Sequence, residues 1–218
     1  MTIKYPDGRY YKGSTDINQS NIKQQHRDNV VFGGRGMSLE ETINDSNDYY
    51  RSQNRAVIYK KPTPIQIVKV DYPQRSKAII REAYFRQAST TDYNGVYRGY
   101  YLDFEAKETT NKASFPLKNF HQHQVDHFQR CLAQEGICFT IMRFASLERY
   151  FVTPASLLID YWQHQDQKRK SIPLKEITAQ GYEVQAGFQP ALDYLAAVDQ
   201  LIANSNLINP KGDNHGTK

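Results

Sequence analysis

One short stretch of the sequence, TTDYNGVYRGYYLDFEAKET, holds two acids and a lysine that could act together. Asp92 precedes a turn-like segment, and Glu105 and Lys107 follow it two residues apart. Two carboxylates brought together repel each other unless a cation lies between them, and hard oxygen ligands favour Mg²⁺ or Mn²⁺. A nearby lysine can orient an attacking water or stabilise charge that builds on phosphorus. The pattern therefore predicts metal-dependent cleavage of a nucleic acid backbone.

The segment YYLDFEAKE must form a strand if these groups are to meet. Its side chains alternate, as the two-residue period of a strand requires. We expect one face to be core, with Leu102, Phe104 and Ala106, and the other to carry the chemistry, with Tyr101, Asp103, Glu105 and Lys107. Tyr93-Asn94-Gly95 is a turn signal, so we expect a hairpin there that brings Asp92 beside the acidic face.

A simpler interpretation is that Glu105 and Lys107 are an ordinary charge pair on an exposed sheet face. An Asp followed loosely by Glu-x-Lys occurs by chance in many sequences. The setting favours the metal site, since the motif lies on an amphipathic strand, after a hairpin and downstream of a basic segment.

That basic segment runs from 57 to 87 and is punctuated by prolines. It holds seven basic and two acidic side chains, and so as much net charge as the whole protein. Basic groups on an extended projection suit DNA contact, because each phosphate contact releases counterions. The alternative is a solvated hairpin edge that its lysines protect from aggregation. The predicted DNA-binding residues are Lys60, Lys61, Lys69, Arg75, Lys77 and Arg81.

Helices and strands alternate irregularly along the rest of the chain. Helices are predicted over about 39–53, 119–135, 155–165 and 191–204, and strands over about 56–60, 137–144 and 149–154. The first helix should start with a capping box of Ser38 and Glu41. Strands flanked by helices without a strict βαβ repeat predict an α/β (α+β) fold with a mixed central sheet.

Length and composition predict one domain with flexible ends. The 218 residues suit a domain over 37–203, in which 61–85 is an inserted stalk, with a flexible arm over 1–36 and a tail over 204–218. The formal charge of +5 favours an acidic partner only modestly. The sequence has no apolar run long enough for a bilayer and no secretory h-region, so we expect a soluble, cytoplasmic protein without a membrane partner.

Several long motifs occur together and in one order. RGMSLEE, KKPTPIQIVKVDYPQRS, IIREAYFRQASTTDYNGVYRG, DFEAKET, SFPLKNFHQHQ and GICF resemble the RecU-type Holliday junction resolvases of bacteria over about residues 35–195. The resemblance implies a restriction-endonuclease-like fold, a homodimer and a stalk that enters the junction. It also implies Mg²⁺-dependent cleavage, with Mn²⁺ as a substitute, of four-way DNA junctions by paired symmetric nicks in recombination and repair.

The same resemblance assigns the site. It places the metal ligands at Thr90, Asp92, Glu105 and Gln124, and the catalytic lysine at Lys107. It implies partnership with the recombinase filament and the branch-migration machinery, and association with the nucleoid. The rival functions are a general restriction-like duplex endonuclease and a non-catalytic junction-binding modulator of recombination. In this fold an acid on the first helix often helps to place the metal, so Glu40 or Glu41 could do so; a solvated helix face is the simpler interpretation.

Two histidines at i and i+4, His123 and His127, have zinc-binding geometry on a helix. A zinc protease would have Glu directly after the first histidine, and Gln124 stands there. We therefore expect His121, His123 and His127 to be helix-surface or DNA-proximal side chains.

Overall fold

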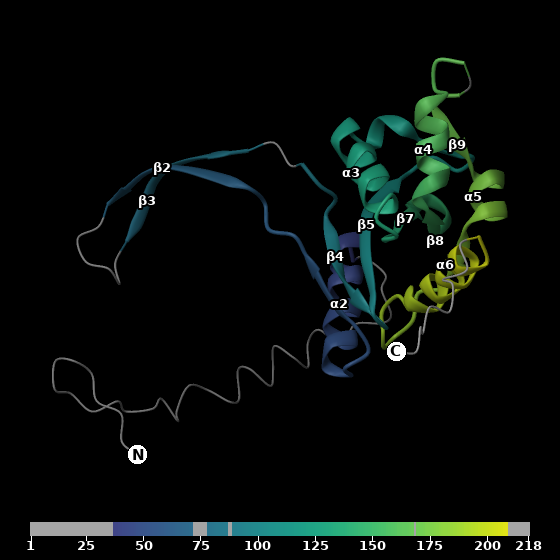
Figure 1. The fold of residues 1–218 in the computed structure, drawn as a ribbon, viewed down its shortest axis with the longest axis horizontal. Helices are drawn as coiled ribbons and strands as arrows, with labels where there is room; N and C mark the ends of the chain where they lie inside the picture. Colours follow the sequence, from purple (N-terminus) through teal and green to yellow (C-terminus); the bar gives the residue numbers. More distant parts are fainter. Residues whose placement is uncertain (1–36, 72–77, 87–88, 168, 209–218) are drawn as a thin grey trace, which may run out of the picture. The chain divides into compact units, whose positions relative to one another are not determined.

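The computed structural model describes residues 37–71, 78–86, 89–167 and 169–208. A mixed sheet of six strands, in the order β1-β4-β5-β7-β8-β10, forms the centre of the fold (Figure 1). Its strands are β1 (Val57–Lys60), β4 (Tyr93–Tyr97), β5 (Tyr100–Thr109), β7 (Ile137–Phe144), β8 (Arg149–Pro154) and β10 (Tyr182–Val184). Of the pairings within it, β5 with β7 is parallel and the others are antiparallel.

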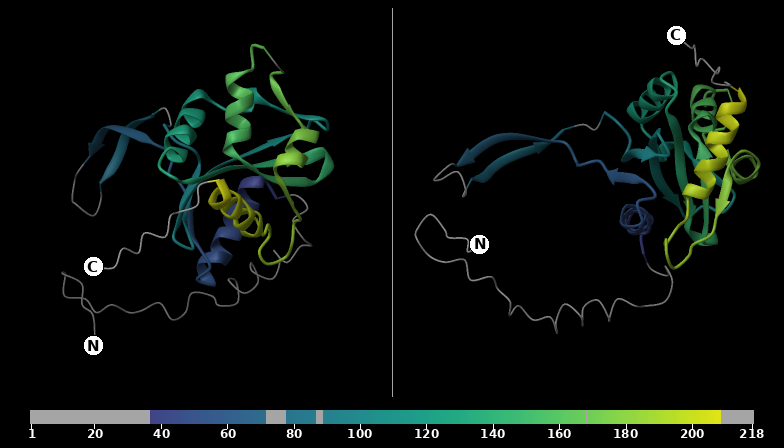
Figure 2. Two further views of the ribbon diagram at one scale, coloured as in Figure 1. Left: turned by 45° about the vertical axis from the view of Figure 1, so that its right-hand side comes forward. Right: turned by 60° about the horizontal axis from the view of Figure 1, so that its bottom comes forward.

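Helices cover both faces of this sheet (Figures 1 and 2). One face packs against α2 (Leu39–Ser52) and α6 (Leu195–Ile208), and the other against α3 (Gln122–Leu132), α4 (Ala155–Gln163) and α5 (Leu174–Gln180). Two hydrophobic cores result, one on each side. The arrangement confirms the α/β class and the mixed sheet flanked by helices, and it is consistent with a restriction-endonuclease-like fold.

Several shorter elements accompany the central sheet. They are β6 (Ser114–Pro116), which pairs with β9 (Ser171–Pro173), and the 3₁₀ turns η2 (Leu117–Asn119) and η3 (Ala145–Leu147). No helix in the described ranges has the length and apolarity that crossing a bilayer requires.

An aromatic stack fixes the register of β5. The ring of Phe104 lies between Tyr93 of β4 at 4.8 Å and Phe139 of β7 at 4.7 Å, both nearly parallel to it. All three side chains are buried, and each is directly opposite its neighbour across the strands. Such cross-strand pairs contribute roughly 0.2–1 kcal/mol each. Because Tyr93 is paired with Phe104, the residue before Tyr93 lies next to the residue after Phe104.

The predicted turn at Tyr93-Asn94-Gly95 is wrong, because these residues lie within β4. The chain reverses at Arg98 and Gly99, whose φ values of 50° and 82° suit a tight hairpin turn. Gly95 serves packing instead: a Cβ there would come 2.2 Å from the carbonyl oxygen of Val57 in β1. The expected consequence nevertheless holds, since the hairpin brings Asp92 to Glu105.

Most predicted elements are confirmed with shifted ends. The Ser38–Glu41 capping box begins α2, with the Ser38 N–H 2.8 Å from a Glu41 carboxylate oxygen. Helix α3 begins later than predicted because η2 occupies the preceding residues, and α6 begins only at Leu195 because Leu192 forms a β-bridge with Ala186. Helix α6 continues to Ile208; the arm over 1–36 and positions 209–218 of the tail lie outside the described residues.

The basic segment forms the hairpin β2 (Ile65–Asp71) and β3 (Ile79–Phe85). Among the described strands, these two pair only with each other, and every residue of β3 is exposed. The pairing is irregular around Lys69, where two register shifts occur. A two-stranded hairpin of this kind has no core of its own, so its exposed surface is available to a partner.

Gly95→Ala should destabilise the protein far more than Gly99→Ala. The first change forces a Cβ into the β1 backbone and should cost on the order of 3 kcal/mol, whereas the second only strains a positive φ in open space and should cost about 1 kcal/mol. Urea unfolding of the two variants measures the difference. Equal losses would contradict the close approach of β1 and β4.

Candidate active site

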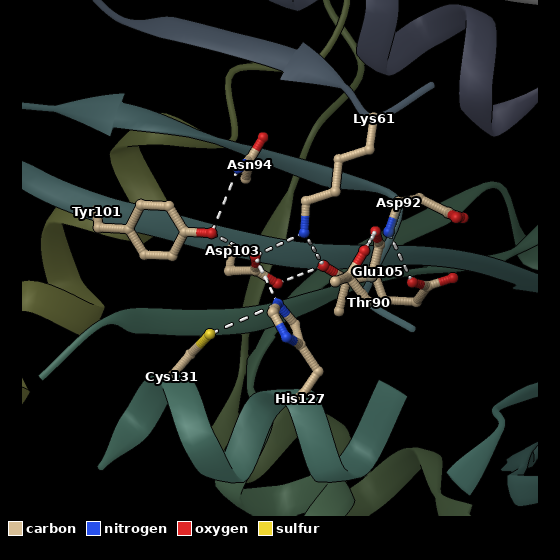
Figure 3. A network of polar contacts seen from close by, with 10 residues as sticks. Lys61, Thr90, Asp92, Asn94, Tyr101, Asp103, Glu105, His127 and Cys131 are labelled. Carbon is tan, nitrogen blue, oxygen red and sulfur yellow. Dashed lines mark hydrogen bonds and ion pairs between the residues drawn. The ribbon is translucent and has the colours of Figure 1, made fainter. Parts of the chain in front are cut away.

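Asp92 and Glu105 meet at the point that the β4–β5 register dictates. Glu105 is fully buried, and its Oε2 accepts a hydrogen bond of 3.0 Å from the main-chain N–H of Asp92. The Asp92 side chain is 43% exposed, so its carboxylate reaches the surface while its backbone is held below. The pair therefore presents one buried and one accessible carboxylate, and Figure 3 shows the hydrogen bond that joins the two residues.

Lys107 forms ion-pair contacts with both acids. Its Nζ forms an ion pair with Oε1 of Glu105 and lies 3.7 Å from Oδ2 of Asp92. The two-residue period of β5 places Lys107 on the same face as Glu105. One ammonium group thus faces two carboxylates.

The electrostatics of Glu105 show that this single lysine does not fully compensate the site. Burial raises the pKa of Glu105 to about 7; Lys107 opposes this shift, and Asp92 adds to it. A buried carboxylate with a raised pKa beside a second carboxylate favours additional positive charge. The donors are hard oxygens, so the residues fit Mg²⁺ or Mn²⁺.

The other two sequence-predicted ligands occupy different positions. Thr90 directly precedes the Thr91–Asp92 pair, and its side chain donates to the Thr91 carbonyl at 3.2 Å. Gln124 is buried in the first turn of α3, where its Oε1 accepts from the main-chain N–H of His121 at 2.9 Å. The structure thus brings Asp92, Glu105 and Lys107 together, while Thr90 and Gln124 form hydrogen bonds with residues close in sequence.

A hollow of about 460 Å³ opens beside the acids. Asp92 and Lys107 line it, and so does Glu40 from α2, which forms an ion pair of 2.5 Å with Lys60. Glu41 instead caps its own helix, and its hydrogen bonds with Ser38 lower its pKa. Of Glu40 and Glu41, Glu40 is therefore the one that faces the hollow.

The strand alternation predicts Asp103 on the chemical face and assigns it no role. In the structure it is fully buried and accepts from several donors (Figure 3). These donors are Lys61 Nζ at 2.8 Å, Tyr101 Oη at 2.8 Å and His127 Nε2 at 3.0 Å, all on Oδ2, and Thr91 Oγ1 on Oδ1. The period-two alternation was the available signal, because it put Asp103 on the same face as Glu105.

Two side chains that were expected at the surface turn inward to Asp103. The Lys61 and His127 side chains are each 17% exposed. The surface expectation for His127 is therefore wrong, because a buried carboxylate on β5 faces this turn of α3. His127 also lies 3.5 Å from the Cys131 sulfur, and Asp103, His127 and Cys131 each place one possible metal-ligand atom within 4.8 Å of the others. His123 is not part of this group; its ring stacks on that of His121 at 5.5 Å.

Two of the other predicted DNA-binding residues, Lys69 and Arg81, lie on the hairpin. Lys69 is exposed on β2, and Arg81 on β3 forms a solvent-exposed ion pair with Asp71 at 2.7 Å. Arg75 and Lys77 lie outside the described residues.

Comparison with known proteins identifies the family. The model of the family described as "Recombination protein U" (RecU) matches residues 34–200. The chain belongs to the RecU family. The RecU-family segment includes the whole acidic stretch, the hairpin and α3.

Curated relatives of this RecU-family chain match over nearly their whole length. A protein of Lacticaseibacillus casei named "Holliday junction resolvase RecU" is 62% identical over 93% of the chain and 96% of its own length. Proteins with the same name from Lactobacillus helveticus and Lactiplantibacillus plantarum are 61% and 60% identical, over 93% and 95% of the chain and 97% and 100% of their own lengths.

Glu105→Gln should stabilise the metal-free protein at pH 8. The pKa of the Glu105 carboxyl group rises from 4.5 to about 7 on folding. The folded protein therefore loses stability as the pH rises from 4.5 to about 7, because the carboxyl group ionises more readily in the unfolded chain. The uncharged amide of Gln removes this pH-dependent loss of stability. We expect the unfolding free energy of the metal-free wild-type protein to fall between pH 5 and pH 8 by on the order of 1 kcal/mol more than that of Glu105→Gln. Thermal unfolding in EDTA across this range measures it. Parallel pH profiles would contradict the raised pKa.

Proposed function

We propose that this chain is a Mg²⁺-dependent Holliday junction resolvase that cuts four-way DNA junctions by paired symmetric nicks in recombination and repair. The observation that carries the proposal is the Asp92–Glu105–Lys107 arrangement in a chain of the RecU family. The names of its close relatives support the same substrate.

The side chains divide the work of hydrolysis. Asp92 and Glu105, with Thr90 and Gln124 as further oxygen donors, would hold Mg²⁺ beside the scissile phosphate. The bound ion supplies positive charge that activates water and offsets the charge developing on the phosphate. Lys107, 3.7 Å from Asp92 and paired with Glu105, orients the attacking water and stabilises the phosphate oxygens.

The bond changes then follow in-line attack. The oxygen of water forms a bond to phosphorus and releases its proton to the solvent. The bond from phosphorus to the 3′ oxygen breaks, and that oxygen takes up a proton. The products are a 3′-hydroxyl and a 5′-phosphate.

Junction selectivity requires contacts beyond the acids. The exposed hairpin β2–β3 carries cations on an extended, coreless projection, so it suits insertion into the open centre of a junction. Paired cuts on symmetry-related strands need two active sites, which a homodimer supplies. A resolvase of this kind would work on the nucleoid in the cytoplasm, with the recombinase filament and the branch-migration machinery as partners.

A cleavage assay tests the function. The purified protein is incubated with a mobile four-way junction or a matched linear duplex, in Mg²⁺ or in EDTA, and the cuts are mapped. We expect symmetric paired nicks in the junction alone, abolished by EDTA. Sequence-specific cutting of the duplex would identify a general endonuclease, and junction binding without cutting would identify a non-catalytic modulator.

Asp92→Asn should bind junctions with nearly wild-type affinity and cut them at least 100-fold more slowly, because the accessible metal ligand loses its charge. Asp166→Asn, an exposed position beyond α4, is the matched control and should cut normally. Single-turnover cleavage and gel-shift titration measure the two properties. Mg²⁺-dependent cutting at the wild-type rate by Asp92→Asn would contradict the assignment of Asp92 as a metal ligand.

Lys69→Gln combined with Arg81→Gln should weaken junction binding more than duplex binding. If both groups contact phosphates, the slope of log affinity against log salt should fall by about 2, since each phosphate contact contributes about 0.9. The control is Lys170→Gln with Lys175→Gln, two exposed lysines, one directly before β9 and one in α5. An equal loss of affinity for junction and duplex would show that the hairpin attracts DNA by its charge without recognising the junction.

A further inference from the structure

The partly exposed Lys61 forms an ion pair with the fully buried Asp103, and both contact Thr91, the residue before the proposed metal ligand Asp92. Lys61 Nζ lies 2.8 Å from Asp103 Oδ2 and also donates to Thr91 Oγ1 at 2.9 Å. Thr91 in turn donates to the other oxygen of Asp103. Lys61, Thr91 and Asp103 thus form a closed triangle of hydrogen bonds, and Thr91 directly precedes Asp92 in the chain.

The backbone of Lys61 adds a second connection. Its main-chain N–H donates to the carbonyl of Asp92 at 2.7 Å, while the N–H of Asp92 donates to Glu105 at 3.0 Å. Asp92 is therefore held at its amide by one proposed metal ligand and at its carbonyl by Lys61. The side chain of Asp92 is left to project toward the hollow.

We propose that Lys61 and Asp103 are a positioning pair, which fixes Thr91 and Asp92 against Glu105 and so sets the distance between the two metal-binding carboxylates. The proposal rests on the proposed function, since it concerns the same site. It gives Lys61 a structural task in place of the DNA contact expected from its position in the basic segment.

A metal ion is the competing explanation for Asp103, His127 and Cys131. The hydrogen bonds oppose it, because Asp103 Oδ2 already accepts from Lys61, Tyr101 and His127. A divalent cation on that oxygen would lie against the Lys61 ammonium group and repel it. The protein's own donors thus compensate the buried charge of Asp103.

The energetics of buried pairs supply a way to separate positioning from stability. Removing one partner leaves an uncompensated buried charge, whereas replacing both with neutral groups of similar shape is often well tolerated. Asp103→Asn and Lys61→Met should each lower Tm, and the double variant should recover most of the loss. If the pair contributes only to stability, the double variant should also bind Mg²⁺ with the wild-type midpoint.

The experiment measures Tm in EDTA, the rise of Tm with Mg²⁺, and the single-turnover rate on a four-way junction. For the double variant we expect Tm within a few degrees of wild type, a Mg²⁺ midpoint at least 5-fold higher, and cleavage at least 10-fold slower. A control that removes another ion pair, Arg149→Met with Glu183→Gln between β8 and β10, should leave the Mg²⁺ midpoint unchanged. A double variant that regains both Tm and the wild-type Mg²⁺ midpoint would overturn the proposal.

Thr91→Val keeps the proposal testable if the charge variants fail to fold. It keeps the Lys61–Asp103 pair and removes only the hydroxyl that joins the pair to the Asp92 segment. We expect a higher Mg²⁺ midpoint here too, and an unchanged one would overturn the proposal. One equivalent of zinc in the purified wild-type protein, lost in Cys131→Ser, would assign Asp103 to a metal site instead. The Mg²⁺-dependent Tm needs no DNA, so it tests the pair even if the junction-cleavage assay refutes the proposed function.

Discussion

Two carboxylates on the buried face of a central strand are the constraint around which this site is arranged. A buried charge must be matched by donors or by a cation, because desolvation costs several kcal/mol per ion. Asp103 is matched by protein donors: a lysine, a tyrosine, a threonine and a histidine. Glu105 has one lysine and one backbone N–H, and burial raises the pKa of its carboxyl group to about 7 despite the opposing effect of Lys107. Two acids on the same face of one strand thus have different surroundings, which fits the scaffold role proposed for Asp103 and the ligand role proposed for Glu105.

Sheet register makes this division possible. A slip of one residue in β5 would turn Asp103 and Glu105 toward the core of α2 and α6 and expose Phe104 to the polar side. The stacked rings of Tyr93, Phe104 and Phe139 oppose such a slip, because all three are buried in one row across three strands. Packing on one face therefore maintains the chemistry on the other.

The sequence predicted what depends on local pattern. Alternation in YYLDFEAKE identified the strand and its two faces, and the capping box located the start of the first helix. The turn at Tyr93-Asn94-Gly95 was misplaced because Asn-Gly has the same local signature whether it turns or lies under a neighbouring strand. The inward orientation of Lys61 and His127 could not be predicted, since it depends on a carboxylate distant in sequence. The starts of α3 and α6 were shifted by a 3₁₀ turn and a β-bridge, which leave weak marks in hydrophobic periodicity.

The two ends of the hairpin segment join the sheet at adjacent positions. Strand β1 ends at Lys60 directly opposite Tyr93 of β4, and the N–H of Lys61 reaches the Asp92 carbonyl at 2.7 Å. An insertion whose ends are already paired can change in length at little entropic cost to the body of the domain. Evolution can therefore lengthen, shorten or recharge the hairpin while the chemistry at its foot is conserved. Recognition of substrate shape and cleavage of the bond can therefore change independently, because they depend on different segments of one chain.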